Sequence, residues 1–386
     1  MRKIVYITGS RAEYGVMKNL LKMLEKDHFF KLSLVVTGMH LSKDFGLTVK
    51  DIKKEGFKIE GLVDMKLKDN TRVGMAKSLG WAIIGISEVL ERLKPQIVLV
   101  AGDRGEILAA AITANHLNIP VAHISGGDIT TGATIDERLR HAITKLSDIH
   151  FPANERSAKN IIKMGENPEC VFPVGNPGIP VKYHLSEKRK KELIRRYNLD
   201  LKKPLILALQ HSVTTQVESA ASQMRETMEA VKSLKMPTIV IYPNSDAGSE
   251  EMIKIIHKYE DLDFIRVYKN IERENFTDLM ALSDVIIGNS SCALLEAPSF
   301  NLPAVNIGVR QEGREHSSNV INVDHDRAKI VDAMKKALTE EFKNRVKKSL
   351  NLYVKRNTEE NIVKILKKIR LSDFPRKKFE KKQKFL

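Results

Sequence analysis

The stretch QIVLVAGDRGEILAAAITANHLNIPVAHI, residues 96–124, has the pattern of a strand, a polar turn, a helix and a second strand. Its apolar runs at 96–102 and 119–124 are short and continuous, as in parallel strands that are buried on both faces. The intervening residues 105–118 have a helical pattern rich in Ala, Ile and Leu. This order of elements predicts a doubly wound α/β domain.

The same alternation continues through both halves of the chain. Further strands are predicted at 3–8, 32–38, 148–153, 204–210, 238–243, 263–269, 284–290 and 303–308. Near residue 175, Gly and Pro precede a heavily charged segment, which fits a linker or a surface helix between domains. Helical patterns near 325–348 and 357–370 follow the last predicted strand.

Length supports two domains, because 386 residues exceed the roughly 250–300 at which single cores stop growing. We predict an N-terminal Rossmann-like domain over 1–180, a C-terminal Rossmann-like domain over 181–355, and a final helix with a basic tail over 356–386. Two such domains face each other across a cleft, and ligands bind where strands end. Functional residues are therefore expected at the strand ends of both domains.

Composition narrows the class of protein. No apolar run reaches the roughly 20 residues that span a bilayer, and the N-terminus lacks the apolar segment of a signal peptide, so no membrane association is expected. The two cysteines, Cys170 and Cys292, lie far apart and outside any metal-ligand spacing. We therefore expect a reducing, cytoplasmic location, no disulfide framework and no metal site.

The formal net charge of +16 raises the question of a nucleic-acid partner. Residues 367–386 hold nine Lys and Arg against two acids, which fits a solvated tail or a frayed final helix. No interleaved aromatic surface or helix-turn-helix pattern accompanies this charge, so no nucleic-acid partner is expected. A general positive field also suits a small anionic substrate.

In the C-terminal half, residues 284–297 run from a buried strand through Gly-Asn-Ser-Ser into a helix. The free backbone N–H groups of a helix start attract phosphate, and the hydroxyls of Ser290 and Ser291 add donors. The carboxylate of Glu296 can accept hydrogen bonds from ribose hydroxyls. The alternative is an N-capped helix with a surface glutamate.

Three further strand ends of the C-terminal half carry polar side chains. The loop after the strand at 303–308 holds Arg310, whose guanidinium suits phosphate or a uracil carbonyl, although a charged surface loop is an equal alternative. His211 and Asn244 follow the strands at 204–210 and 238–243. Either could be a ligand-binding residue or an ordinary loop residue.

In the N-terminal half, the first strand leads into ITGSRAEYG, which is not the GxGxxG pattern of dinucleotide binding. No nicotinamide or other cofactor is therefore expected. Arg11 and Glu13 begin the following helix, and an arginine at the positive end of a helix dipole suggests a bound anion. His40 and Arg104 lie at the ends of two further strands.

Acidic side chains converge at the ends of two neighbouring predicted strands. They are Asp103, Asp128, Asp136 and Glu137. Asp136 with Arg140, and Glu137 with His141, are also spaced as i,i+4 pairs that could simply join on a helix surface. Several acids opposite a phosphate-type helix start favour proton transfer and C–O cleavage on a nucleotide sugar.

From about residue 4 to 350, the sequence resembles the UDP-N-acetylglucosamine 2-epimerase family, and within it the hydrolysing branch of sialic-acid-type sugar synthesis. The motifs that carry the resemblance are RAEYG (11–15), VTGMHLSKDFG (36–46), AGDRGE (101–106), HISGGDITTGATIDERLRHAITK (123–145), PNSDAGS (243–249), GNSSCALLEA (288–297) and VRQEGRE (309–315). Their order and spacing are specific as a set.

The resemblance implies a GT-B fold, usually as a homodimer or a homotetramer. It also implies a UDP-sugar substrate and anti-elimination. A base removes the C2 proton while UDP leaves C1, and water then adds to the resulting 2-acetamidoglucal to give N-acetylmannosamine. The catalytic acids that it implies are Asp103, Asp128, Asp136 and Glu137.

The binding residues follow from the same resemblance. It implies that the diphosphate is bound by Arg11, His211, Ser290 and Ser291. It implies that the residues near the nucleoside are Glu296, Arg310 and Asn244. On the sugar side it implies His40, Arg104 and Arg140, and Glu13 belongs to the same motif as Arg11.

Two positions depart from the family pattern. Asp128 stands where the hydrolysing branch commonly has Glu, and Ser125 stands where relatives often carry His or an acid. Because this loop lies beside the sugar, epimerisation of a GDP- or UDP-linked diacetamido sugar is an alternative. Non-hydrolysing epimerisation and glycosyl transfer on a GT-B fold are further alternatives, and a binding protein that relies on the basic tail is the last.

Overall fold

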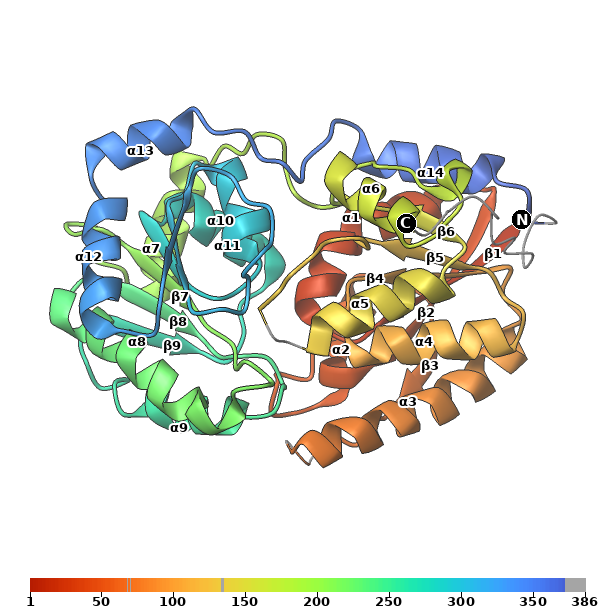
Figure 1. Cartoon of the computed structure of the whole chain (residues 1–386), viewed down its shortest axis with the longest axis horizontal. Coiled ribbons are helices and arrows are strands. Elements are labelled where there is room, and N and C mark those ends of the chain that lie inside the picture. The colour runs from red at the N-terminus through yellow and green to blue at the C-terminus, as the bar shows by residue number, and fades with distance from the viewer. Residues whose placement is uncertain (68, 70, 133–134, 372–386) are drawn as a thin grey trace, which may run out of the picture.

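The computed structural model describes residues 1–67, 69, 71–132 and 135–371. Within these residues the chain forms two units, each built on a parallel sheet of six strands with helices packed around it (Figure 1). The two predicted doubly wound α/β domains are therefore confirmed.

The N-terminal unit places its functional loops at one edge of its sheet. Its strand order is β3 (Ile59–Val63), β2 (Phe30–Thr37), β1 (Arg2–Thr8), β4 (Ile97–Ala101), β5 (Val121–Ile124) and β6 (Ile149–Phe151). Its helices are α1 (Arg11–Lys26), α2 (Val49–Lys54), α3 (Arg72–Leu93), α4 (Gly105–His116), α5 (Ile135–Leu146) and α6 (Glu155–Lys163). Because neighbouring strands are parallel, the loops after β1, β2, β4 and β5 meet at the same edge.

The C-terminal unit repeats this plan. Its strand order is β12 (Val320–Val323), β11 (Ala304–Ile307), β10 (Val285–Gly288), β7 (Ile206–Leu209), β8 (Thr238–Ile241) and β9 (Ile265–Tyr268). Its helices are α7 (Glu187–Tyr197), α8 (Ala220–Leu234), α9 (Ser249–His257), α10 (Arg273–Leu282), α11 (Cys292–Leu295), α12 (Arg327–Ala337) and α13 (Glu340–Lys347). The charged segment after residue 175 thus contains a helix, α7.

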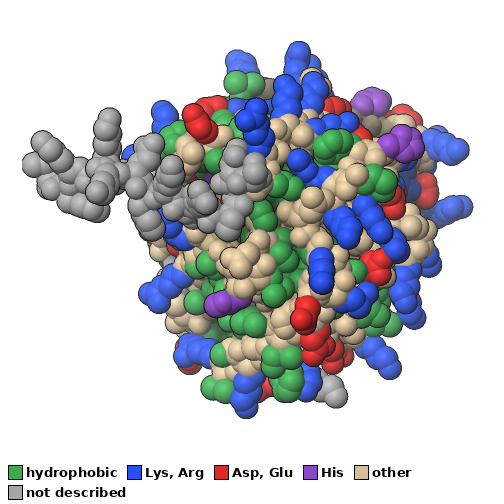
Figure 2. All heavy atoms as spheres, turned by 90° about the vertical axis from the view of Figure 1, so that its right-hand side faces the viewer, with side chains coloured by type: hydrophobic (Ala, Val, Ile, Leu, Met, Phe, Trp, Pro, Cys, Tyr) green, Lys and Arg blue, Asp and Glu red, His purple; other side chains and the backbone are tan. Residues whose placement is uncertain are grey.

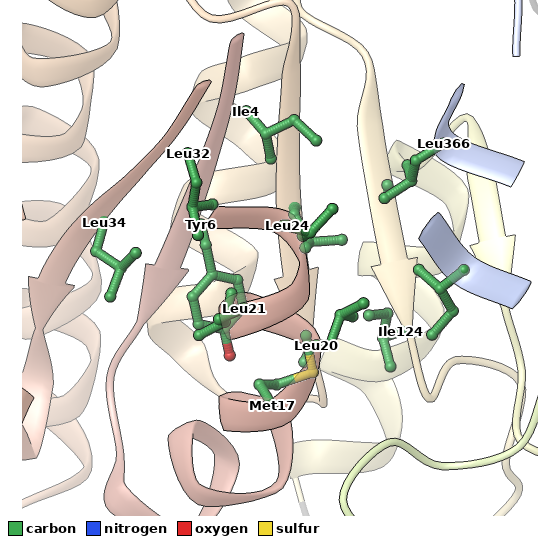
Figure 3. Packing of buried hydrophobic residues seen from close by; sticks show 14 of the residues in the cluster. Ile4, Tyr6, Met17, Leu20, Leu21, Leu24, Leu32, Leu34, Ile124 and Leu366 are labelled. Carbon is green, nitrogen blue, oxygen red and sulfur yellow. The ribbon is translucent and has the colours of Figure 1, made fainter. Parts of the chain in front are cut away.

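The last described helix, α14 (Thr358–Lys368), returns to the N-terminal unit and lies beside α1 (Figure 1). Its Ile362 and Leu366 belong to the same fully buried cluster as Ile4 of β1 and Leu24 of α1. Figure 3 shows Leu366 next to the α1 side chains over the sheet. The described part of the predicted segment 356–386 is therefore a component of the N-terminal core.

Three elements differ from the sequence expectations. The predictions missed the strands β3 and β12, which are outer strands of their sheets and half exposed, so that neither shows a continuous apolar run. The single helix predicted near 325–348 is two helices, α12 and α13. The break comes where the Thr339 side chain accepts a hydrogen bond from the Phe342 N–H and starts a new helix.

Helix α3 alone, among the described residues, is long and apolar enough to cross a membrane by length and composition. This helix contains no uninterrupted apolar run of that length, because polar residues are spaced along it. One face of α3, with Ala82, Ile86 and Leu90, is buried in the N-terminal core. Length and composition alone are therefore weak support for a membrane span.

Figure 2 shows the end of the molecule formed by the N-terminal unit, over which Lys and Arg side chains are spread widely, with Asp and Glu among them. On this face the positive charge is distributed over the surface. The predicted basic tail beyond residue 371 lies outside the described residues.

Candidate functional site

A cavity of about 360 Å³ lies between the carboxyl ends of the two sheets. The residues predicted for the site that line this cavity are Arg11, Glu13, Asp103, Arg104, Asp128, Asp136, Arg140, His211, Asn244, Ser290, Ser291, Glu296 and Arg310. Parallel strands in each unit bring these side chains, which are far apart in the sequence, to facing edges.

Asp103 follows β4 and forms an ion pair with Arg140 of α5. Gly102 has a positive φ of 84°, which turns the chain sharply before this carboxylate. Burial alone would raise the pKa of Asp103, but the positive charges of Arg140 and Arg314 lower it to about 2. Asp103 is thus an ionised group at neutral pH, and it holds Arg140 in place.

Asp136 pairs with a residue of the opposite unit. Its carboxylate accepts a hydrogen bond from Arg310 at 3.0 Å, so the surface pair of Asp136 with Arg140 that its spacing allowed is not formed. Burial, together with the negative charges of Asp103 and Asp246, raises the pKa of Asp136 to about 6. A carboxyl group with such a pKa can both accept and donate a proton near neutral pH.

Asp128 is held between the two units. The Ser157 hydroxyl donates to its carboxylate at 2.6 Å, and the Arg314 guanidinium lies 3.6 Å away. The preceding Gly127 has φ 82°, and a Cβ there would lie 2.3 Å from the Ser157 carbonyl oxygen. Only glycine therefore lets this loop pass so close to α6.

The loop that carries Asp128 also contacts the C-terminal unit directly. The Thr131 N–H donates to the Glu312 carbonyl at 2.7 Å. A Cβ on Gly132 would lie 1.7 Å from the Val309 carbonyl oxygen. The Gly and Thr residues of this segment therefore allow close contact between two backbones.

Two predicted site residues do not line the cavity. Glu137 accepts hydrogen bonds from Thr130, Arg140 and His141, so the predicted pair with His141 is formed. Burial would raise the pKa of Glu137, but these hydrogen bonds and the charge of Arg140 lower it to about 2. In this position Glu137 holds the loop at Thr130 and the side chain of Arg140 in place.

His40 is the second predicted residue outside the cavity lining. It is fully buried, with its ring nitrogens 3.1 Å from the Thr8 hydroxyl and 2.7 Å from the Thr48 hydroxyl. Burial lowers its pKa to about 4, so its ring is neutral at pH 7. The Thr8 hydroxyl in turn donates to Glu13, which does line the cavity.

Burial and the nearby charge of Glu106 raise the pKa of Glu13 well above its usual range. Arg11 lies two residues earlier, at the first position of α1, and pairs with Asp51 at 3.4 Å. The start of α1 therefore presents one cation and one proton-binding carboxyl group to the cavity.

On the opposite wall, His211 follows β7 and its Nδ1 accepts a hydrogen bond from the Asn244 N–H at 3.0 Å. Burial and the charge of Arg310 lower the pKa of His211 to about 3. A neutral ring whose Nδ1 is an acceptor carries its proton on Nε2. His211 is thus prepared to donate one hydrogen bond to an anion without being charged.

The turn after β10 adds Ser290 and Ser291 to this wall at the start of α11. Glu296 follows α11 and forms an ion pair with Arg273 at 2.5 Å. Arg273 also lines the cavity, but it starts a helix in an ordinary charged segment and no sequence signal marks it.

Asp246 is a further buried carboxylate that the sequence reasoning missed. It accepts hydrogen bonds from Arg104 of the N-terminal unit at 3.1 Å and from the Asn244 side chain at 2.6 Å. Burial would raise its pKa, but Arg104 and Arg310 lower it. Its place after β8 is a strand-end signal, the same one that singled out Asn244.

The described residues contain no group of three or more His, Cys, Asp or Glu side chains placed to hold a metal ion. What the cavity does contain is an N-terminal wall with several carboxyl groups and a C-terminal wall with donors and cations. The first wall can move protons, and the second can bind an anion such as a diphosphate.

Comparisons with known proteins agree with this geometry. Residues 22–367 match the sequence profile of the UDP-N-acetylglucosamine 2-epimerase family. A UDP-N,N'-diacetylbacillosamine 2-epimerase (hydrolyzing) of Legionella pneumophila is 41% identical over 96% of this chain and 97% of its own. Polysialic acid biosynthesis protein P7 of Escherichia coli is 35% identical over 95% and 94%.

A UDP-GlcNAc 2-epimerase from Neisseria meningitidis, solved with UDP-GlcNAc bound, has the same fold. It superposes with a TM-score of 0.78 at 20% identity, and the match covers 95% of this chain and all of that one. The architecture is thus of the GT-B type, as predicted. By its sequence profile and its relatives, this chain belongs to the UDP-N-acetylglucosamine 2-epimerase family.

Proposed function

We propose that the protein is a hydrolysing UDP-N-acetylglucosamine 2-epimerase, which converts UDP-N-acetylglucosamine and water into UDP and N-acetylmannosamine. The observation that carries the proposal is one cavity with Asp103, Asp128 and Asp136 on one wall and His211 and Arg310 on the other. The hydrolytic outcome is supported by the Legionella relative, whose name includes it.

The diphosphate of the substrate would bind the C-terminal wall. His211 would donate from Nε2, and the hydroxyls of Ser290 and Ser291 would supply further donors. The guanidinium of Arg11 would donate from the facing N-terminal wall. Glu296 would accept from the ribose hydroxyls. Binding at this wall would present the sugar to the carboxyl groups opposite.

In the elimination step, Asp136 is the base. Above its pKa of about 6 it is ionised and can take the C2 proton, whereas Asp103 with a pKa of about 2 is a much weaker base. The electron pair of the C2–H bond forms the C1=C2 double bond, and the C1–O bond breaks with its electron pair leaving on UDP. The product is UDP and a 2-acetamidoglucal.

In the hydration step, water adds its hydroxyl group to C1 and a proton is added to C2. Inversion at C2 requires that this proton arrive on the face opposite to the one from which Asp136 took its proton. We assign this delivery to Asp128, a second aspartate on the same wall whose position is set by Ser157. Its carboxylate takes the proton that the adding water loses and passes it to C2, while Asp136 returns the proton that it took from C2 to solvent. Asp103 would act by orienting Arg140.

A UDP-linked 2,4-diacetamido sugar is the second candidate substrate. The 41% identity to the Legionella enzyme named for UDP-N,N'-diacetylbacillosamine favours it. Such a sugar has the same C2–H and the same 2-acetamido group, so the two steps are unchanged. Only the contacts to the rest of the ring would differ.

The products of the two UDP-sugars, followed by ¹H and ³¹P NMR, test this proposal. Free UDP together with N-acetylmannosamine from UDP-N-acetylglucosamine is the expected result. A kcat/KM at least about 100-fold higher for the diacetamido sugar would select the second candidate. UDP-N-acetylmannosamine without free UDP would show a non-hydrolysing enzyme. Transfer of an unaltered sugar to an added acceptor would show a glycosyltransferase.

A further inference from the structure

A fully buried asparagine joins the ends of two strands in the C-terminal unit. Asn289 follows β10, and its side chain reaches the loop after β7. Its Oδ1 accepts a hydrogen bond from the His211 N–H at 2.7 Å, and its Nδ2 donates to the His211 carbonyl at 2.8 Å. Because both bonds go to the backbone of one residue, this amide fixes the place at which His211 enters the cavity.

The amide group of Asn289 is needed for both bonds at once. An aspartate would place a second acceptor against the His211 carbonyl, and an alanine would leave the buried N–H and carbonyl of His211 without these partners. Gly288 has φ 120°, and a Cβ there would lie 2.2 Å from the Leu209 carbonyl oxygen. The two strand ends are therefore close enough for the side chain of one loop to bind the backbone of the other.

The backbone carbonyl of Asn289 makes contacts that lead to the other wall of the cavity. It accepts hydrogen bonds from Arg310 at 3.3 Å and from the Gln311 side chain at 2.9 Å. Arg310 pairs at 3.0 Å with Asp136, the proposed base. Asn289 thus holds the diphosphate donor His211 with its side chain and the cation beside the base with its main chain.

Gln311 extends these contacts toward the second aspartate. It is buried, and its Oε1 accepts a hydrogen bond from the Arg314 guanidinium at 3.0 Å while its Nε2 donates to Asn289. Arg314 in turn lies 3.6 Å from the Asp128 carboxylate. The contacts of Gln311 therefore continue those of Asn289 as far as the residue that delivers the proton to C2.

We propose that the side chains of Asn289 and Gln311, here named the amide bridge, position the groups on which both proton transfers depend. Neither side chain lines the cavity, so neither touches the substrate. They act through His211, Arg310 and Arg314, which do line it. The inference rests on the proposed function, because the roles of the two aspartates come from it.

Filling of the core does not explain two amides at this place. A buried polar group costs free energy unless its hydrogen bonds are made, so a site that only had to be filled would be met by apolar side chains. The amide bridge instead joins the loops after β7, β10 and β11. Such a bonded network is rigid, and groups that act on a substrate must be held to within about 0.5 Å.

Gln311→Met tests the part of the amide bridge that leads to Asp128. Methionine is similar in length but makes neither bond, so Arg314 loses its partner while His211 keeps both bonds to Asn289. Elimination should continue and hydration should slow, so that 2-acetamidoglucal leaves with its C1=C2 double bond intact. In ¹H NMR the ratio of glucal to N-acetylmannosamine should rise about ten-fold or more over the wild type.

Gln223→Met is the matched control for this ratio. Gln223 is also buried in the C-terminal unit, and its Nε2 donates to Gln216 at 2.8 Å, outside the amide bridge. Loss of a buried amide by itself lowers the amount of folded enzyme and leaves the product ratio unchanged. Equal ratios for Gln311→Met and Gln223→Met would therefore contradict the role of Gln311.

Asn289→Ala tests the part of the amide bridge that leads to the diphosphate. His211 loses two backbone bonds, so the Kd for UDP should rise about ten-fold or more in calorimetric titration. Asn319→Ala is the control, because Asn319 is fully buried in the same unit and donates to the carbonyls of Ala293 and Leu302. The control should lower the melting temperature by a similar amount and keep the Kd. An unchanged Kd for Asn289→Ala, or an equal rise in both variants, would overturn the proposal.

The products of the wild type distinguish failure of the reaction from failure of the amide bridge. If the wild type releases no UDP and no 2-epimerised sugar, the proposed function fails, and with it the role of Gln311 in hydration. The UDP affinity of Asn289→Ala still tests the contact with His211 in that case. If the wild type releases both products and both variants match their controls, the amide bridge alone fails.

Discussion

Asp136 lies where two opposing influences on its charge meet. Burial and two neighbouring carboxylates disfavour its ionised form, while the guanidinium of Arg310 at 3.0 Å favours it. The result is a pKa near 6, which suits a group that must hold and release a proton in each turnover. The proposed mechanism depends on this residue more than on any other.

Replacement of Asp136 by asparagine should lower kcat by about 10²–10⁴-fold, because the amide cannot take the C2 proton. UDP should still bind within a few-fold of the wild-type affinity, since the donors of the C-terminal wall remain. Steady-state kinetics and calorimetric titration with UDP measure the two effects. Asp332→Asn, on an exposed face of α12, is the control and should match the wild type. Near wild-type kcat for Asp136→Asn would rule out its role as the base.

The pH profile gives a second expectation at the same residue. The active form of the base is ionised, so kcat/KM should rise with pH up to about 6 and level off above it. Arg310 lowers the pKa of Asp136, so Arg310→Gln should move the rising limb to higher pH. A limb that does not move between the two proteins would mean that another group titrates.

Residue types at the strand ends were predictable from the sequence, but their partners were not. The spacing of Asp136 and Arg140 suggested a local pair, yet each is paired with a residue outside its own helix turn. Arg310 and Asp136, which form one of these pairs, lie 174 positions apart in the sequence. Contacts across a cleft depend on how two units are placed, and helical spacing carries no information about that.

At the scale of elements, the loop after β5 depends on two glycines for different reasons. Gly127 is needed for its positive φ and its contact with α6, and Gly132 for its contact with the Val309 carbonyl. Backbone flexibility alone would not explain both glycines, because Gly132 is needed where two backbones come into close contact.

Gly132→Ala should therefore disturb catalysis more than folding. The added Cβ must displace the loop that carries Asp128, and a shift of about 1 Å at a catalytic group costs on the order of 100-fold in rate. The kcat/KM value and the melting temperature distinguish the two effects. Gly105→Ala, where a Cβ meets nothing within 4 Å, is the control. Equal kcat/KM values for both variants would refute this role of Gly132.

Helix α14 is a second element whose place the sequence did not reveal. Its apolar pattern predicted a helix, but nothing in that pattern shows which unit it covers. Buried strands and amphipathic helices can be predicted from local pattern, whereas the outer strands β3 and β12 and the docking of α14 depend on tertiary packing.

Leu366→Ala should destabilise the N-terminal unit by about 2–5 kcal/mol, because this fully buried side chain would leave a cavity against α1. Urea unfolding followed by the fluorescence of Trp81, the one tryptophan, reports on this unit. Leu352→Ala, at a 38% exposed position, is the control and should change the unfolding free energy by less than about 0.5 kcal/mol. Equal unfolding curves for the two variants would place α14 outside the core.

At the scale of the whole molecule, the cavity is an assembly of two units that neither completes alone. Ion pairs of Arg310 with Asp136 and of Arg104 with Asp246 join the walls at the cavity. A substrate diphosphate that pairs with Arg310 would weaken the ion pair between Arg310 and Asp136. Nucleotide binding on one wall would thus be coupled to the basicity of the group on the other.

The central claim is that this cavity removes the C2 proton of a UDP-sugar and releases UDP. Turnover of UDP-N-acetylglucosamine in D₂O tests it most directly, with ¹H NMR and mass spectrometry of the isolated sugar. The account predicts N-acetylmannosamine with one deuterium at C2, formed in step with free UDP and lost in Asp136→Asn. Free UDP with a sugar that keeps its C2 hydrogen would contradict the account.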